Sequence, residues 1–445
     1  MSAISIGASI GARLDRLPVT QLHRKVFNLI AVGMFFEGFD IYIAASVLGA
    51  TYKSGFSTLE QNGFFISMTF VGMTLGALLT GFLGDRYGRQ FTYQLNLIVF
   101  GAASLVSAVA PNMTTLIVLR FLMGLGLGAE VVVGYAMMAE FFPAGIRGRW
   151  SGMMCTLVTA GLPVSAFLAW LLVPTFGWRV MFLLGAVGSF VAWFLRRELP
   201  ESPRWLVVMG RDAEADALVS RFEREAGFAS TSNLPSAPET IVPHAAGDLF
   251  QSPFLASLIV GCISLMVANS LIQGFVVWLP TFFVGQGESI ARSTGFAMLM
   301  ALGGPIGSAL GALAADYLGR KLTIVTVACL AIVLSVAFVF SGTSPVMPII
   351  GFLLTIPIYL LVAVLFAIYI PELFPTALRL RGVGICNAVG RSASIIVPLL
   401  IGPLFANLGI AGVLAAMSGA LLAMCVVVVA LGTETRVQRL SVATA

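Results

Sequence analysis

The sequence has little charge for its length and is dominated by apolar residues. Only 10% of its 445 residues are charged, whereas 58% are hydrophobic, and its mean hydropathy is +0.98. These charged side chains are too few to cover the surface of a soluble globular protein of this size. The composition therefore predicts a membrane protein. The net charge of +5 is scattered between apolar runs and forms no basic patch with interleaved aromatic residues, which argues against binding to nucleic acid.

Cysteine and histidine are too few and too scattered for a metal centre or a thiol enzyme. The five cysteines lie singly in apolar segments without CxxC spacing, and His23 and His244 lie in polar stretches. We therefore expect no metal, no cofactor and no enzymatic activity, with the cysteines filling apolar space. The first 26 residues lack the short apolar core and cleavage site of a signal peptide, so we expect them to stay on the chain.

Long apolar runs make up most of what is present. A spanning helix needs about 20 mostly apolar residues, and twelve such windows follow one another. They are 26–51, 61–84, 91–110, 114–141, 149–173, 178–196, 254–284, 292–315, 322–341, 346–373, 382–407 and 410–431.

These windows predict an all-α membrane protein with twelve transmembrane helices in two pseudo-symmetric bundles. The first six-helix bundle covers 1–196, a cytoplasmic linker covers 197–252, and the second six-helix bundle covers 253–445. The first part of the linker is charged and predicts an amphipathic helix at the membrane surface, whereas the rest is rich in Ser, Pro and Thr.

Lysine and arginine are distributed unevenly between the two sides of the predicted membrane. With the N-terminus inside, twenty of the 25 basic residues fall on the inner side, and only Lys53, Arg179 and Arg292 fall outside. Arg120 and Arg391 lie within helices. Because positive charge marks the cytoplasmic side, we predict a multi-pass protein of the cell membrane, the inner membrane in a bacterium, with both termini cytoplasmic.

The sequence also repeats itself at about half its length. DRYGR at 85–89 matches DYLGR at 316–320, and EFFPAGIR at 140–147 matches ELFPTALR at 372–379, at offsets of 231 and 232 residues. The repeat predicts two related halves. Acids and arginines at helix ends can form ion pairs that lock neighbouring helices on one side of the membrane, with plain positive-inside anchoring as the alternative. The candidate gating residues are Asp85, Arg86, Arg89, Glu140, Arg147, Asp316, Arg320, Glu372 and Arg379.

Several strings resemble motifs of the major facilitator superfamily. GFLGDRYGRQ at 81–90 is similar to that family's loop between helices two and three, and RFLMGLGLG at 120–128 resembles its fourth-helix motif. PESPRWL at 200–206 and PELFPT at 371–376 look like the branch that holds sugar porters, organic-acid symporters and organic-ion transporters. WLPTFF at 278–283 resembles the aromatic-acid and niacin-type proton symporters. The resemblance implies two bundles around a central cavity that opens alternately to each side.

Charged side chains inside the predicted helices mark the candidate proton-coupling site, because a charge in a bilayer must be paired or face water. Asp40 lies roughly 16 Å and Arg120 about 9 Å below the outer ends of their helices. We predict that they pair, and the resemblance to proton-coupled sugar porters implies the same pair. We further predict that Asp40 takes up the transported proton and so releases Arg120, with a permanent bridge as the alternative.

Glu37 and Glu130 lie deeper, at roughly 21 Å and 24 Å. The sequence leaves each of them as a second proton site, a substrate contact or an acid kept neutral by a hydrogen bond.

Arg391 is the one cation that the second half places inside a helix. Its guanidinium can hold a carboxylate with two hydrogen bonds, so we predict an anion clamp, with a snorkelling arginine as the alternative. The resemblance agrees, since family members that handle organic anions carry an arginine in this helix. Further hydrogen bonds and an aromatic wall for the substrate are expected from Gln273, Asn387, Tyr42, Trp278 and Tyr359, with plain packing as the alternative for each aromatic residue.

Together these features predict a proton-coupled secondary active transporter that imports a small organic anion, an aromatic or other monocarboxylate, by alternating access. A proton-coupled sugar or polyol symporter is the alternative. PESPRWL and the GFD at 38–40 favour it, but 268–284 lacks the Gln-Gln pair and downstream Asn that it requires. A sensor on the same fold is not separated from a transporter by the sequence. As partners we expect a small-molecule substrate, protons and the lipid bilayer, with the protein acting as a monomer.

Overall fold

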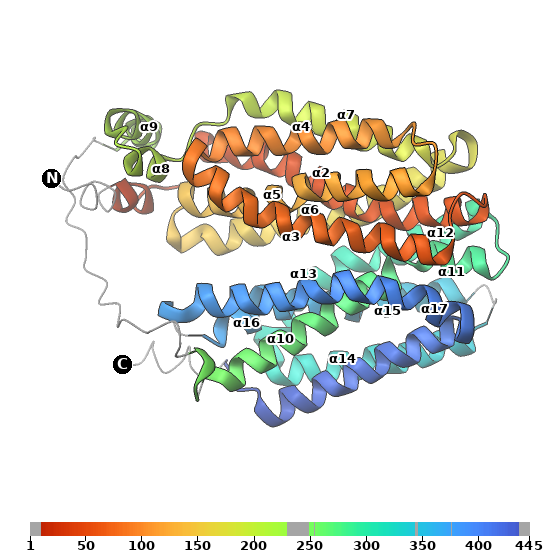
Figure 1. The fold of residues 1–445 in the computed structure, drawn as a ribbon. Helices are drawn as coiled ribbons and strands as arrows, with labels where there is room; N and C mark the ends of the chain where they lie inside the picture. Colours follow the sequence, from red (N-terminus) through yellow and green to blue (C-terminus); the bar gives the residue numbers. More distant parts are fainter. Residues whose placement is uncertain (1–9, 229–248, 253, 343–345, 375, 436–445) are drawn as a thin grey trace.

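A computed structural model describes residues 10–228, 249–252, 254–342, 346–374 and 376–435. All regular elements in these ranges are helices, as the sequence predicts. Figure 1 shows them as two bundles packed side by side, α2–α7 in one and α10–α17 in the other. We call the end of the bundles that carries α8 and α9 the linker side, and the opposite end the far side.

The first bundle contains the six predicted helices. Side-chain caps mark where several of them begin: Thr20, Thr58 and Asn112 each accept a hydrogen bond from the first turn of the helix that follows. The helices are α2 (Gln21–Lys53), α3 (Leu59–Tyr87), α4 (Arg89–Ser107), α5 (Met113–Phe141), α6 (Ala144–Phe176) and α7 (Arg179–Leu195).

The second bundle contains six further spans, three of them interrupted by a short irregular or π-helical stretch. The seventh comprises α10 (Phe254–Leu271), η3 (Ile272–Val276) and α11 (Leu279–Gly285), and the eighth α12 (Ile290–Ala301) and α13 (Gly303–Leu318). The ninth is α14 (Arg320–Phe340), and the tenth comprises α15 (Met347–Ala363), η4 (Val364–Tyr369) and α16 (Ile370–Glu372). The last two form α17 (Thr376–Leu431), which is broken at Gly409, where φ is 63°.

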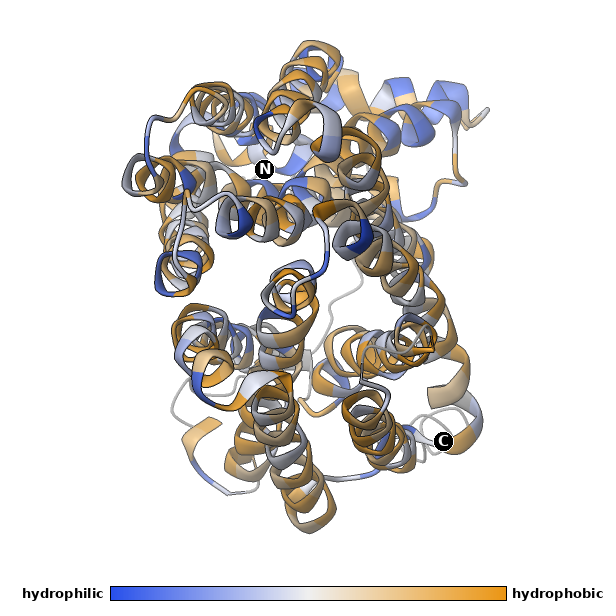
Figure 2. Ribbon diagram, turned by 90° about the vertical axis from the view of Figure 1, so that its right-hand side faces the viewer, coloured by the Kyte–Doolittle hydropathy of each residue, from blue (hydrophilic) through white to orange (hydrophobic). Residues whose placement is uncertain are grey.

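Length and hydropathy alone identify ten membrane spans in the described residues. One of the ten, 381–431, is two spans on either side of Gly409. The span that the criterion misses is α4, whose 19 residues include Gln90, Gln94 and Asn96. Counting 381–431 as two spans and adding α4 gives twelve, so the twelve predicted helices are confirmed. Large apolar side chains such as Phe82 and Phe340 are exposed on the bundles, and Figure 2 shows hydrophobic residues along the helices of both, which suits contact with lipid.

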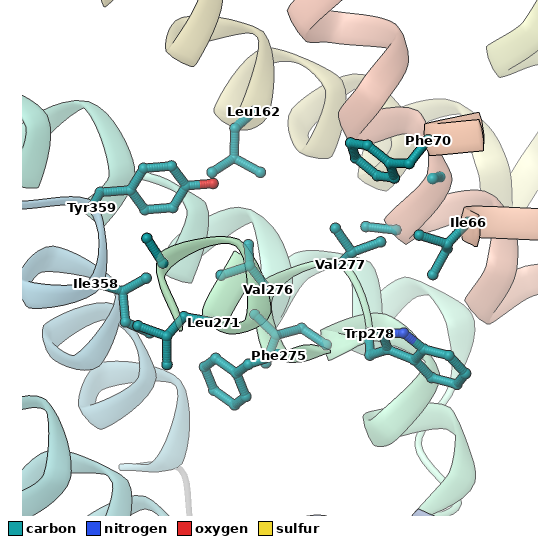
Figure 3. Close-up of a cluster of buried hydrophobic side chains, with 14 of the residues drawn as sticks. Ile66, Phe70, Leu162, Leu271, Phe275, Val276, Val277, Trp278, Ile358 and Tyr359 are labelled. Atoms are coloured by element: carbon teal, nitrogen blue, oxygen red, sulfur yellow. The ribbon is translucent and has the colours of Figure 1, made fainter. Parts of the chain in front are cut away.

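The two bundles touch each other through the far-side parts of their helices. The Ser67 hydroxyl donates to the Ile395 carbonyl at 2.6 Å, and Lys53 donates to the carbonyl of Glu288. A Cβ atom at Gly63 would lie 2.6 Å from the Pro398 carbonyl oxygen, so the glycine permits a close backbone approach. Figure 3 shows the apolar side chains of α3, α6, η3 and α15 that meet in this region. The far side is therefore closed.

The linker forms two helices, α8 (Pro203–Val208) and α9 (Asp212–Glu225). The apolar face of α9 is not free to lie on a membrane surface, contrary to the sequence-based expectation. Its residues Ala215, Val219 and Phe222 are buried in one cluster with Ile10 and Leu14 of the short helix over 10–15.

An ion-pair cluster holds the short N-terminal helix against α9. Arg13 donates to Glu223 at 2.8 Å and to Asp216 at 2.5 Å, and Arg16 donates to Glu223 at 2.5 Å. Burial opposes the charge of Glu223, but the hydrogen bonds from the two arginines outweigh it and lower the pKa of this carboxyl. We call Arg13, Arg16, Asp216 and Glu223 the α9 clamp.

Candidate functional site

Asp40 of α2 and Arg120 of α5 form an ion pair buried in the first bundle. Arg120 donates to the Asp40 carboxylate and, at 2.8 Å, to the Asp40 backbone carbonyl. It also donates to the Thr69 hydroxyl at 3.0 Å and lies over the ring of Phe65. Asp40 and Arg120 are at most 1% exposed. The pairing deduced from helix depth is thus present, whereas its role in proton transfer is a proposal taken up below.

A second buried pair joins Glu130 of α5 to Arg196, which follows α7. The guanidinium lies 2.5 Å from the carboxylate, donates to the carbonyls of Leu29 and Ile30, and stacks on the ring of Tyr93. Arg196 stands at the inner end of the predicted window 178–196 and is one of the twenty basic residues counted on the inner side. Its side chain is 1% exposed and reaches back between the helices.

Glu37 lies close to Glu130 but is not part of that pair. Its side chain is 2% exposed, and its Oε2 has no hydrogen-bond partner among the described residues. Glu37 and Glu130 line one small cavity between α2, α4 and α5. Glu37 and Glu130, which were predicted at similar depths, are therefore neighbours in space.

Arg391 lies on α17 in the second bundle, about midway along the part of the helix before the break at Gly409. It is half-buried, and no hydrogen bond or ion pair ties it to another described residue. Its charge and that of Glu37 are close enough to attract each other across the junction of the bundles. Among the described residues, a cation of the second bundle and an acid of the first thus lack a bonded partner of their own.

Two of the predicted aromatic residues meet at the same junction. The hydroxyls of Tyr42 on α2 and Tyr359 on α15 are 3.1 Å apart, and Figure 3 shows Tyr359 beside Leu162. Between the bundles Tyr42, Ser46, Ser165 and Thr355 border a cavity of about 10 Å³, room for one water.

The other predicted substrate residues are dispersed through the second bundle. Gln273 is buried in η3 with its Oε1 free of partners in the described chain, whereas Asn387 donates to the Val383 carbonyl of its own helix. Trp278 is 1% exposed and stacks on Phe282, within the apolar cluster of Figure 3. It is therefore a packing residue in this conformation.

The candidate gating residues pair within each bundle, on the linker side. Arg89 lies 3.7 Å from Glu140, and Arg320 donates to Glu372 at 3.0 and 3.2 Å. Arg86 is exposed and lies over the ring of Tyr87. The side chains of Asp85, Arg147, Asp316 and Arg379 lie outside the described part.

Two glutamates outside the predicted site cap helices on the linker side. Glu201 accepts the backbone N–H groups of Arg89 and Gln90 at the start of α4, at 2.9 and 3.2 Å. Glu434 accepts those of Arg320 and Lys321 at the start of α14, both at 3.0 Å. The two glutamates are 233 residues apart, close to the repeat offsets of 231 and 232. Each carboxylate stabilises the positive end of a helix dipole and ties it to a segment distant in sequence.

The arrangement described so far is that of a transporter: two helical bundles closed against each other on one side, with charged side chains inside their membrane-spanning helices. Comparison with known families agrees, since the model of the Major Facilitator Superfamily matches residues 30–398. The chain belongs to this superfamily and is a membrane transporter of metabolites, not an enzyme.

Individual relatives and a solved structure are similar to this chain over most of its length. An inner-membrane metabolite transport protein of Escherichia coli K12 is 34% identical over 436 residues, which cover 96% of each chain. A niacin transporter of Acinetobacter baylyi is 30% identical and covers 96% of this chain and 97% of its own. The inward-open, partially occluded structure of an Escherichia coli xylose transporter has a TM-score of 0.73 at 17% identity, covering 93% of this chain and 98% of that one, and shares the fold.

Proposed function

We propose that the protein is a proton-coupled importer of a small aromatic monocarboxylate. The observation that carries the proposal is Arg391, a cation at the junction of the bundles with no partner among the described side chains. An unpaired charge at membrane depth is costly unless a ligand or water compensates it. A planar guanidinium binds a carboxylate with two parallel hydrogen bonds, and the aromatic hydroxyls of Tyr42 and Tyr359 lie at the same junction.

The relatives favour the same class of substrate. One of them is a niacin transporter, and niacin is an aromatic ring that carries one carboxylate. We take nicotinate as the test ligand for this reason.

The coupling is assigned to the Asp40–Arg120 pair. Both groups are buried, and a proton on Asp40 would remove the charge that holds Arg120. Arg120 would keep its contacts with the Asp40 carbonyl and Thr69, so the two helices would loosen without separating. This is the kind of two-state contact that alternating access needs.

The proposal includes the orientation of the protein in the membrane. The linker side faces the cytoplasm, with both termini there, and the far side faces outward in the cell membrane. The protein acts as a monomer, and the described far-side contacts correspond to a conformation from which substrate leaves to the cytoplasm. The ion pairs of Arg89 and Arg320 within each bundle keep their helices together as rigid units during the movement.

A binding assay tests the substrate class. We expect purified protein to bind nicotinate, Arg391→Ala to lose this binding at least tenfold, and Arg391→Lys to recover part of it because lysine keeps the charge but not the fork. Arg292→Ala is the matched control, since that arginine is 69% exposed and pairs with Glu288 on the far side. Unchanged affinity in Arg391→Ala would refute the clamp.

Gln273 supports a sugar or polyol as the second candidate. Its amide is buried in η3 with Oε1 available, and such a group suits a hydroxyl. D-xylose is the test ligand. Binding of xylose that is lost in Gln273→Ala and kept in Arg391→Ala would favour this candidate over the anion.

A further inference from the structure

A small cavity between α2, α4 and α5 lies inside the first bundle and has three polar side chains in its lining. Its volume is about 10 Å³, enough for one water. Glu37, Glu130 and Asn96 contribute the polar lining, and Leu97, Phe100 and Leu127 contribute apolar lining. A cavity of this size with three polar side chains in its lining suits a single small occupant.

The polar atoms around the cavity are not satisfied by the described protein atoms. Glu37 Oε2, Glu130 Oε2 and Asn96 Nδ2 have no hydrogen-bond partner there, although their residues are only 2%, 3% and 7% exposed. Buried polar atoms are nearly always paired, by protein or by water. Two carboxylate oxygens that accept and one amide that donates form a suitable set for one water molecule.

The charges around the cavity do not balance. Glu37 and Glu130 carry two negative charges when ionised, and Arg196 supplies one positive charge at 2.5 Å from Glu130. Arg391 does not line the cavity, so within the cavity the remaining negative charge can be compensated by one proton. A sodium ion would need several more oxygen ligands than the apolar remainder of the lining provides.

We propose that a water in this cavity joins Glu37 to Glu130 and that the two carboxyls share one transported proton, at a site separate from Asp40. Arg391 is the alternative counter-charge for Glu37. When a substrate carboxylate occupies Arg391, Glu37 keeps the proton. When the substrate leaves, Glu37 passes the proton to solvent on the linker side and Arg391 balances the charge that remains. The part concerning Arg391 rests on the proposed function, whereas the shared proton does not.

Other charged and titratable groups surround Glu37, and two of the nearby arginines already have partners. Arg120 is already engaged by Asp40, and Arg196 by Glu130. The charged and titratable groups that interact with Glu37 are Tyr42 on α2, Tyr93 on α4, Glu130 and Tyr135 on α5, Arg196 after α7, and Arg391 on α17.

Infrared spectroscopy tests the shared proton without any substrate. We expect purified protein in lipid to show a protonated-carboxyl band that disappears as the pH is raised. The band should be lost in Glu37→Gln and in Glu130→Gln, and kept in Asp40→Asn and in the exposed control Glu214→Gln. An unchanged band in Glu37→Gln, or a band lost only in Asp40→Asn, would overturn the proposal, as would a band abolished by sodium at constant pH.

A second variant covers the case in which the glutamine variants do not fold. Asn96→Leu keeps both acids but removes the amide donor of the cavity, so the same band should shift in frequency. A band that is identical in Asn96→Leu and in wild type would contradict the water-joined pair.

Transport measurements test the link to Arg391 separately. In liposomes that contain nicotinate, Glu37→Gln should exchange labelled nicotinate across the membrane at a rate within about twofold of wild type, but should not accumulate it under an inward proton gradient. Accumulation at the wild-type level would refute the coupling role of Glu37. If wild type does not bind nicotinate, the proposed substrate fails, while the infrared result still decides the shared proton.

Discussion

The buried pair Asp40–Arg120 allows the sharpest prediction of stability. Asp40→Asn leaves the Arg120 charge buried with neutral partners only, namely the Asp40 carbonyl and Thr69. Breaking a buried ion pair by removing one partner costs about 3–5 kcal/mol of the free energy of unfolding. Arg120→Gln should cost a similar amount, because it leaves the Asp40 carboxylate without its cation.

The double variant tests whether the two side chains are energetically coupled. Neutral Asn and Gln can hydrogen-bond to each other, so the double variant with Asp40→Asn and Arg120→Gln should lose about 1–3 kcal/mol less unfolding free energy than the two single variants lose in sum. Tryptophan fluorescence during SDS unfolding in mixed micelles measures all four proteins. Additive costs would show that the two side chains are not coupled and would refute our account of the site.

Three further predictions concern the remaining contacts. In Gly33→Ala the new Cβ atom would lie 2.0 Å from the Arg196 guanidinium, so we expect it to expel that side chain and lower the free energy of unfolding by about 3 kcal/mol or more, measured by the same SDS unfolding. Glu201→Ala removes the cap of α4 and should cost about 0.5–2 kcal/mol in that measurement. Because the pKa of Glu223 lies below its ordinary value of 4.5, its contribution to the α9 clamp is fully present above pH 4.5 and lost as the pH falls through the lowered value. Hydrogen exchange of α9 should follow this pattern, and Arg13→Ala should abolish it.

The sequence predicts the parts of this protein that depend on hydropathy and on charge at membrane depth. Each of the twelve apolar windows coincides with a span because a bilayer requires a continuous helix of about that length. Depth along the helices and the family resemblance both pair Asp40 with Arg120, and depth is informative because both helices cross the same membrane. Glu37 and Glu130 were placed at a common depth for the same reason.

Other contacts have no recognisable pattern in the sequence and could not be predicted from it. Arg196 lies at the end of an apolar window, where a loop arginine looks the same as one whose long side chain turns back into the bundle. Asn96 and Thr69 are neutral polar residues whose role depends on which helices face them. Cys262 and Cys386 lie singly in the sequence, yet helix packing brings their sulfur atoms within 3.9 Å of each other.

Simultaneous measurement of substrate and proton movement tests the central claim most directly. Liposomes that contain the purified protein and a pH-sensitive dye are given labelled nicotinate outside under an inward proton gradient. We predict that nicotinate accumulates above its external concentration, that protons enter with it, and that an uncoupler abolishes the accumulation. Accumulation that persists when the proton gradient is collapsed, or proton entry that does not depend on nicotinate, would contradict the account.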